Sequence, residues 1–218
     1  IPVHKAQAFI QASLESADDI PGLAGELLMM FADAKDRLEG AAHATGTGTD
    51  QPTGIFTALD ANTNVEIVSD TAAALFKEDL DEVYRSVPVR FRGRSAWLMN
   101  PIWALEIQNL GTALSNKYST NITEGTTAQL YNRPVVESDD APSTTTTTVR
   151  DNRIVFGDFS NFVIVDKPGS FGVQYIPVMF NTSNNLPDGR VGWYANWRTG
   201  SDSVNDLAFR LLQDKTSA

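Results

Sequence analysis

The residue types that most often carry catalysis or bind metals are scarce in this chain. It contains two histidines, His4 and His43, and no cysteine. The histidines do not stand in the H-E-x-x-H arrangement of zinc hydrolases, and without cysteine the common zinc sites lack ligands. We therefore interpret both histidines as packing or surface residues, and we predict neither a metal site nor a cofactor.

Two short motifs resemble chemical signatures without matching them. Ser95 lies in Gly-Arg-Ser-Ala-Trp, which lacks the second glycine of the G-x-S-x-G nucleophile elbow. The run Gly46-Thr-Gly-Thr contains half of a dinucleotide-binding fingerprint, but the third glycine is missing and the run follows a predicted helix instead of a strand. We predict no catalytic residue and no nucleotide site from either motif.

Acidic residues are plentiful, and paired carboxylates can bind a divalent cation or act as an acid–base pair. The candidate clusters are Asp18-Asp19, Glu78-Asp79, Asp81-Glu82 and Asp139-Asp140. Glu78 and Glu82 share one face of a predicted helix, which is also the face on which a soluble helix keeps its charges. We interpret the clusters as solvent-exposed, and a carboxylate- or metal-dependent hydrolase stays an alternative function.

The charge of the chain argues against a nucleic-acid-binding domain. There are 27 acidic and 17 basic residues, which gives a formal net charge of −10. Phosphate contacts require clustered lysine and arginine. The one basic cluster, Arg90-Phe-Arg-Gly-Arg94, is interpreted as a solvated turn before a strand. No apolar run approaches the roughly 20 residues of a membrane span, and no signal peptide is recognisable.

Hydrophobic periodicity predicts the main elements that must position these residues. Residues 3–9 are typical of a strand. Apolar side chains at three- and four-residue steps predict a long amphipathic helix over residues 20–43, with Asp33 and Arg37 as an ion pair on its outer side. A second helix is predicted over residues 71–86. Its inward residues are Phe76, Leu80, Val83, Tyr84 and Val87, and its solvent-facing residues are Glu78, Asp81, Glu82 and Arg85.

The second half of the chain has a sequence pattern typical of strands and loops. Val191, Trp193, Ala195 and Trp197 alternate with more polar residues, which predicts a half-buried strand after a turn at residues 187–189. The threonine run at residues 144–148 is interpreted as an exposed loop. Together these patterns predict a mixed α+β fold with helices on a largely antiparallel sheet.

Residues 95–110 form the most informative segment, because they predict a strand that runs directly into a capped helix. Asn100 is a preferred N-cap residue, and Pro101 occupies the first helical position, where its missing N–H costs nothing. Trp103, Ile107 and Leu110 fall on one helical face. Gly111 follows them where the helix is expected to end.

This segment resembles the W-v-M-N-p motif of the major capsid proteins of tailed bacteriophages, which share the HK97-like fold. Four further segments resemble motifs of that family in the same order. They are 46–56 (G-x-G-x-x-Q-P-x-G-I), 133–142 (x-P-V-v-x-s-d), 157–165 (G-D-f) and 198–212 (R-x-G-x-x-v-x-x-x-A-F-x-x-L). Together they cover nearly the whole chain.

The resemblance implies an HK97-like fold with two domains. Residues 1–50 and 189–218 would form the peripheral P domain around a long spine helix, and residues 51–188 would form the axial A domain. By the same analogy, loops at residues 115–125 or 139–152 are expected to point toward the symmetry axis.

The resemblance also implies a function, that of a structural major capsid subunit and not an enzyme. It would self-assemble into pentamers and hexamers of an icosahedral shell around double-stranded DNA, without sequence-specific binding, in the virion after assembly in the host cytoplasm. Portal, scaffold and decoration proteins are the other expected partners, and no membrane is involved. An encapsulin-type nanocompartment shell protein is the alternative with the same fold.

One departure from the family pattern concerns the start of the chain. Family members carry an N-terminal arm and a two-stranded extension, the E-loop, before the strand that leads to the spine helix, whereas this sequence begins with that strand at Ile1. We therefore predict no crosslinking residue. We expect the chain to be monomeric or to form small oligomers. Intact particles would refute the view that the N-terminal arm and the E-loop are required for assembly.

Overall fold

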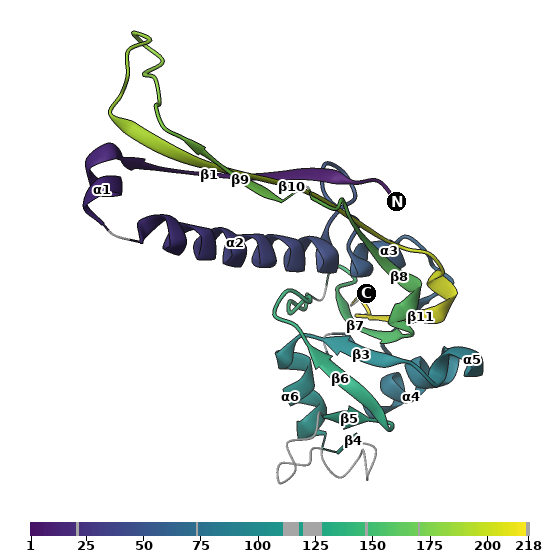
Figure 1. The fold of residues 1–218 in the computed structure, drawn as a ribbon. Coiled ribbons are helices and arrows are strands. Elements are labelled where there is room, and N and C mark those ends of the chain that lie inside the picture. The colour runs from purple at the N-terminus through teal and green to yellow at the C-terminus, as the bar shows by residue number, and fades with distance from the viewer. Residues whose placement is uncertain are drawn as a thin grey trace.

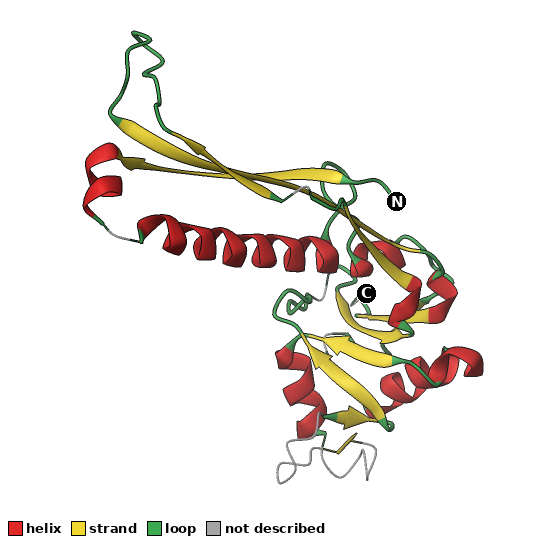
Figure 2. Ribbon diagram, viewed as in Figure 1, coloured by secondary structure: helices red, strands yellow, loops and turns green. Residues whose placement is uncertain are grey.

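The computed structural model describes residues 1–20, 22–72, 74–110, 118–119, 128–146, 148–169 and 171–216. Figure 1 shows an elongated arm, made of long strands and one long helix, joined at one end to a more rounded body. Figure 2 shows that the arm carries its helix on one side of its strands, whereas helices flank the body sheet. None of the described helices combines the length and apolarity needed to cross a membrane.

The arm is built on a single long strand that is paired along both edges. Within the described residues its antiparallel sheet contains four strands, β1 (His4–Ser13), β8 (Phe162–Asp166), β9 (Gly172–Ile176) and β10 (Arg190–Ser203). β1 pairs with β10 from His4 opposite Thr199 to Ser13 opposite Arg190. β9 and β8 pair with successive parts of β10 on its other side.

Two helices follow β1, namely α1 (Leu14–Asp19) and α2 (Leu23–Thr45). α2 returns along the arm (Figure 1), and Leu27 and Phe31 pack against Trp193 and Trp197 of β10. The predicted helix over residues 20–43 is confirmed with shifted ends. It begins only after Gly22, whose φ of 90° is left-handed, because such a backbone cannot belong to a right-handed helix.

The strand predicted over residues 3–9 is also confirmed, and it continues to Ser13. Its residues alternate between half-buried and exposed along the whole length, as expected when one face packs on α2 and the other meets solvent. The strand predicted around residues 190–198 is confirmed and extends to Ser203. The alternation ends at Ser13 because its side chain accepts a hydrogen bond from the Ser16 amide and caps α1.

The body is built on a mixed sheet of seven strands within the described residues. In spatial order these are β2 (Glu66–Val68), β11 (Phe209–Gln213), β7 (Asn152–Gly157), β3 (Ala96–Met99), β6 (Arg133–Glu137), β5 (Gln129–Leu130) and β4 (Tyr118–Ser119). The pairs β2–β11 and β3–β6 are parallel and the other pairs are antiparallel.

Helices cover both faces of the body sheet. α4 (Lys77–Ser86) and α6 (Pro101–Asn109) pack on the face that carries Trp97 and Phe156, and α3 (Ile55–Asp60) packs on the face that carries Val155. The remaining described helical turns are α5 (Val89–Arg92), η2 (Phe159–Asn161) and η3 (Asp206–Ala208). The indole of Trp97 stacks on Phe156, with ring centroids 4.2 Å apart.

The start of α6 agrees with the sequence, whereas the start of α4 does not. Asn100 Oδ1 accepts a hydrogen bond from the Ile102 amide at 3.1 Å, with Pro101 at the first helical position. α4 begins at Lys77 instead of residue 71, because Phe76 is extended and its amide donates to Asp79. Phe76, predicted to face the core, is 43% exposed. Gly111 lies outside the described residues.

Candidate assembly surfaces

Both histidines lie in the arm. His4 stands on β1, and His43 lies in the last turn of α2 with its Nδ1 atom 2.9 Å from Ser201 Oγ. The Ser201 hydroxyl donates to the Thr53 carbonyl, so this network ties the end of α2 to β10 and the following turn. Burial lowers the pKa of His43, while Glu39 acts in the opposite direction.

The two discarded motifs have structural roles. Ser95 is buried, and its hydroxyl donates to the Arg92 carbonyl at 2.9 Å, so it is bonded to the backbone. In the turn after α2, a Cβ atom added to Gly46 would lie 2.2 Å from the Pro52 carbonyl oxygen. The Gly54 amide donates to the Gly46 carbonyl at 2.9 Å. Glycine is thus required here by close backbone packing.

The acidic clusters divide into exposed charges and structural partners. Asp18-Asp19, Glu78, Glu82 and Asp139-Asp140 are exposed, as predicted. Asp79 is buried, and it accepts hydrogen bonds from the amides of Asp70 and Phe76 at 3.0 and 2.9 Å. No group of three or more metal-binding side chains occurs within the described parts of the chain.

The prediction that Asp81 faces solvent is wrong. Asp81 is only partly exposed, and it accepts a hydrogen bond from the Tyr131 hydroxyl. Burial, followed by this hydrogen bond to Asp81, raises the pKa of Tyr131. The contact joins α4 to the turn between β5 and β6, which the helical spacing alone does not reveal.

The arginine cluster stabilises its own turn. Arg92 donates to the carbonyls of Val87 and Arg85 at 2.8 and 2.5 Å, and its guanidinium lies 5.2 Å from the centre of the Tyr84 ring. Arg90 packs over the ring of Phe91. Arg92 is thus committed to backbone carbonyls, whereas Arg90 and Arg94 of the same cluster are exposed.

A buried ion pair between Arg153 and Asp214 has no signal in the sequence. Both side chains are fully buried, and they come from β7 and from the residue just after β11. The Arg153 guanidinium also lies 4.6 Å from the centre of the Trp103 ring. Burial raises the pKa of Asp214, and Arg153 opposes this increase. The pair fixes the last described residues of the chain to the body.

Several apolar residues near the start of α2 are left exposed by the arm sheet. They are Leu28, Met29 and Met30, and Met29 is 76% exposed. We call these three residues the helix patch. A 3.1 Å ion pair between Asp33 and Arg37, predicted from the sequence, lies on the exposed side of the same helix. The sequence indicated exposed apolar side chains here, because Leu27 to Met30 are four consecutive apolar residues and one helical face cannot bury all four.

A second apolar surface lies at residues 177–189, the connection between β9 and β10. Val178, Phe180 and Leu186 are exposed there, and we call them the tip patch. Figure 1 shows this connection projecting from the end of the arm farthest from the body. Exposed apolar side chains that gather on one element are candidates for contact with another chain. The arm therefore presents two candidate surfaces for contact with other chains.

The decisive comparison is with protein families. The sequence pattern of the phage capsid family matches residues 1–214. The chain belongs to the phage capsid family. As a capsid subunit it is a structural, non-enzymatic protein of an icosahedral shell, it assembles with copies of itself, and it resides in the virion. None of the curated proteins compared with it matches.

Solved structures agree with the fold of the capsid subunit. The capsid of an empty GTA particle, computed with C5 symmetry, has a TM-score of 0.79 at 23% identity, over 99% of this chain and 74% of that chain. A chain from the structure named Microbacterium phage Oxtober96 has a TM-score of 0.70 at 14% identity, over 98% of this chain and 73% of that chain. A chain of the holo-SrpI encapsulin complex from Synechococcus elongatus PCC 7942 has a TM-score of 0.70 at 13% identity, over 96% of this chain and 73% of that chain.

Proposed function

We propose that this capsid subunit forms pentamers and hexamers that build a shell around double-stranded DNA of any sequence. The observation that carries the proposal is the pair of apolar surfaces on the arm, the helix patch and the tip patch. They lie on an element that extends away from the body, where another copy can reach them. Apolar side chains in the centre of an interface supply much of its binding energy.

The net charge supports a shell that does not bind its DNA tightly. A chain with 27 acidic and 17 basic residues repels phosphate overall, so DNA can slide along the inner surface. Portal, scaffold and decoration proteins are proposed as further partners, without a surface assigned to any of them. Assembly is expected to take place in the cytoplasm of the bacterial host.

We propose a division into a P domain and an A domain that follows the strand pairing. The arm, with β1, α2 and β10, corresponds to the proposed P domain. The pairing of β8 and β9 with β10 favours adding residues 162–176 to it. The pairing of β11 with β7 favours assigning residues 209–213 to the proposed A domain. Both changes depart from the domain boundaries expected from the sequence, which are 1–50, 51–188 and 189–218. The division into domains stays a prediction.

An encapsulin-type shell is the second candidate function, favoured by the likeness to the SrpI encapsulin chain. That likeness, at 13% identity, concerns the fold alone. The two candidates differ in what the shell encloses. Particles purified from the natural source that contain DNA support the phage function, and particles that contain a cargo enzyme support the alternative.

The test of assembly is the mass of the purified chain in solution, by light scattering after size exclusion with negative-stain images. We expect species of about the mass of five or six copies. Met29→Ser in the helix patch and Phe180→Ser in the tip patch should shift the distribution toward monomer. The matched controls are Asp36→Ser and Thr182→Ser, which change exposed polar residues of the same two elements. Equal effects of patch and control variants would contradict the assignment of these surfaces.

A further inference from the structure

A hollow of about 340 Å³ on the arm is bordered by three cationic side chains. They are Lys5 of β1, Arg198 of β10 and Lys167, the residue that follows β8, and all three are exposed. We call these three residues the cation row. No carboxylate of the described residues lines this hollow. The arm thus carries a local concentration of positive charge, although the net charge of the chain is −10.

The register of the arm sheet places the three side chains next to one another. Lys5 lies directly opposite Arg198. The Lys167 amide donates to the Arg198 carbonyl at 3.3 Å, which continues the pairing of β8 with β10 by one residue. Because this carbonyl points away from β1, Lys5 and Arg198 form a non-hydrogen-bonded pair, in which opposite side chains are closest. Like charges in such positions destabilise a sheet, so a bound anion would stabilise it.

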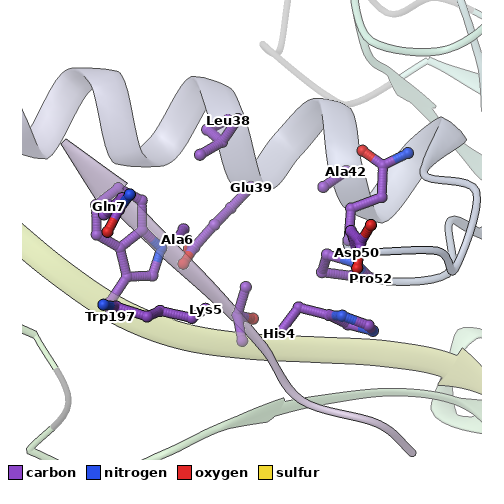
Figure 3. Close-up of a pocket in the computed structure, with 12 residues that line it drawn as sticks. His4, Lys5, Ala6, Gln7, Leu38, Glu39, Ala42, Asp50, Pro52 and Trp197 are labelled. Atoms are coloured by element: carbon purple, nitrogen blue, oxygen red, sulfur yellow. The ribbon is translucent and has the colours of Figure 1, made fainter.

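Two carboxylates border the cation row without balancing its charge. Glu39 is paired with Lys35 at 2.6 Å, and Figure 3 shows Glu39 extending from α2 on the helix side of the arm sheet. Asp166 lies opposite Thr199, whose buried side chain faces the same helix. Among the described residues, neither lysine of the cation row has an ion-pair partner.

The donors around the hollow define the class of ligand. Ammonium and guanidinium groups can only donate, and a guanidinium group matches the two oxygens of a carboxylate. The Lys5 ammonium lies 5.7 Å from the centre of the Tyr194 ring, a contact that leaves its positive charge in place. Three cations around one hollow favour a ligand with more than one negative charge, such as two adjacent carboxylates.

The chain itself exposes such a pair of carboxylates. Asp18 and Asp19 of α1 are both exposed, and neither forms an ion pair within the part of the chain that the structure describes. The other acidic clusters are less available. Asp79 and Asp81 accept hydrogen bonds within the body, and the Asp140 carboxylate lies against α2.

One copy of the chain cannot bring these groups together. Figure 1 shows α1 at the end of the arm away from the body, whereas Lys5 lies near the opposite end of β1. A strand rises about 3.3 Å per residue, so the rest of β1 separates Lys5 from α1 by ~26 Å. The contact therefore requires a second copy, arranged head to tail. Repeated head-to-tail contacts produce closed rings or open chains.

We propose that the cation row binds the Asp18-Asp19 pair of a second copy, as an ionic contact between the arms of neighbouring subunits. This contact rests on the self-assembly proposed above and assigns it a second kind of surface, which is polar instead of apolar. Charge complementarity gives such a contact its orientation and its partner specificity more than its strength.

The first test is crosslinking with a carbodiimide, which forms an amide between a lysine amine and a carboxylate that lie in contact. A mixture of ¹⁴N- and ¹⁵N-labelled chains shows by mass spectrometry which crosslinks join two copies. We expect lysines of the cation row to be joined to Asp18 or Asp19 of another copy. The Lys35–Glu39 pair, which lies within one chain, is the positive control for the chemistry.

Charge exchange is the second test, with the dissociation constant of self-association measured by light scattering over a dilution series. Lys167→Glu should weaken self-association about two- to tenfold, because attraction becomes repulsion. Asp18→Lys combined with Asp19→Lys should act in the same direction. A chain that carries all three changes should recover part of the loss. Arg94→Glu makes the same charge change at an exposed site of the body and should have no effect.

The outcomes separate this contact from assembly in general. Species of several copies without crosslinks between the cation row and Asp18 or Asp19 would overturn the contact and leave the proposed assembly intact. A chain that is monomeric at every concentration and forms no such crosslinks would overturn both. Saturable binding of a labelled DNA duplex that Lys167→Glu abolishes would assign the cation row to phosphates, and would also overturn the proposal.

Discussion

The side-chain amide of Asn100 donates a hydrogen bond to the Ala141 carbonyl, 3.0 Å away, while its oxygen caps α6. One buried side chain therefore fixes the start of a helix and the chain that follows β6. The neighbouring Trp103 indole donates to the Pro142 carbonyl in the same segment. The motif that first suggested a capsid protein thus consists of residues that hold the body together.

Replacing Asn100 should destabilise the body. Asn100→Ala removes the cap and leaves the Ala141 carbonyl unsatisfied, so we expect a loss of about 1–3 kcal/mol in the free energy of unfolding. Asn100→Asp keeps the capping oxygen but removes the donor, and should lose less. Urea unfolding measures the free-energy loss of each variant, provided that the dependence of the free energy on urea concentration is unchanged. Equal losses for the two variants would contradict the double role of Asn100 as helix cap and hydrogen-bond donor.

Gly157 should tolerate no side chain. A Cβ atom there would lie 2.5 Å from the Ala208 carbonyl oxygen, so Gly157→Ala should cost about 1–3 kcal/mol through overpacking. Gly25 on α2 is the matched control because a Cβ atom meets nothing within 4 Å. Gly25→Ala should stabilise by about 0.5–1 kcal/mol. Thermal unfolding of both variants measures these changes. Similar unfolding midpoints would be evidence against the close approach of Gly157 to the Ala208 carbonyl.

The buried Arg153–Asp214 pair should be sensitive to the loss of one partner. Arg153→Met leaves the Asp214 carboxylate buried without its cation, with an expected cost of about 3–5 kcal/mol. Adding Asp214→Leu should restore part of the stability, because no buried charge then remains. Arg37→Met, which breaks the exposed pair with Asp33, should cost only about 0–1 kcal/mol. A double variant no more stable than Arg153→Met would contradict this account.

Acidification should weaken the junction of α2 and β10 through His43. Because burial lowers the pKa of His43 in the folded chain, the unfolded chain binds a proton first as the pH falls through the ordinary value of 6.5. Stability contributed by neutral His43 is therefore present above that value and is lost as the pH falls toward the lower folded pKa.

His43→Asn removes the titration and keeps an amide that can donate to Ser201. The difference in unfolding free energy between about pH 8 and about pH 5 should be larger for the unmodified chain than for this variant. His4 and the carboxyl groups are present in both proteins, so their contributions cancel. An identical pH dependence in the two proteins would refute the role of His43.

Isolated subunits should bind duplex DNA weakly. The net charge of −10 and the commitment of Arg92 to backbone carbonyls leave little basis for phosphate contacts. Fluorescence anisotropy with a labelled duplex should show no saturable binding at ~0.15 M salt. Binding at about micromolar concentration under those conditions would count against a shell along which DNA slides.

The sequence predicted the elements better than it predicted their surroundings. The periodicity of residues 20–43 and the cap at Asn100 depend on neighbouring residues, so local pattern was sufficient for both. The same periodicity treats Leu27 and Met30 as equivalent, although the arm sheet covers Leu27 and leaves Met30 exposed. Which apolar side chains are covered depends on how far the strands extend across the helix, and no local pattern contains that information.

Contacts between distant segments could not be predicted for the same reason. Arg153 and Asp214 are far apart in sequence, and no spacing rule joins them. The short helix α1 was not predicted because its N-cap, Ser13, is also the last residue of β1. The alternation of half-buried and exposed residues along β1 hides the change from strand to helix. Ala6, Ala42 and Trp197 line one pocket between β1, α2 and β10, although in the sequence they are only ordinary apolar positions far apart along the chain.

The strands of the arm lie along its length, and β1 is paired with β10 over ten consecutive residue pairs. Antiparallel hydrogen bonds are perpendicular to the strands. A pull along the arm therefore loads this ladder in shear, so that all its bonds resist together instead of opening one after another. We therefore expect the arm to resist a pull along its length more strongly than a pull across its strands.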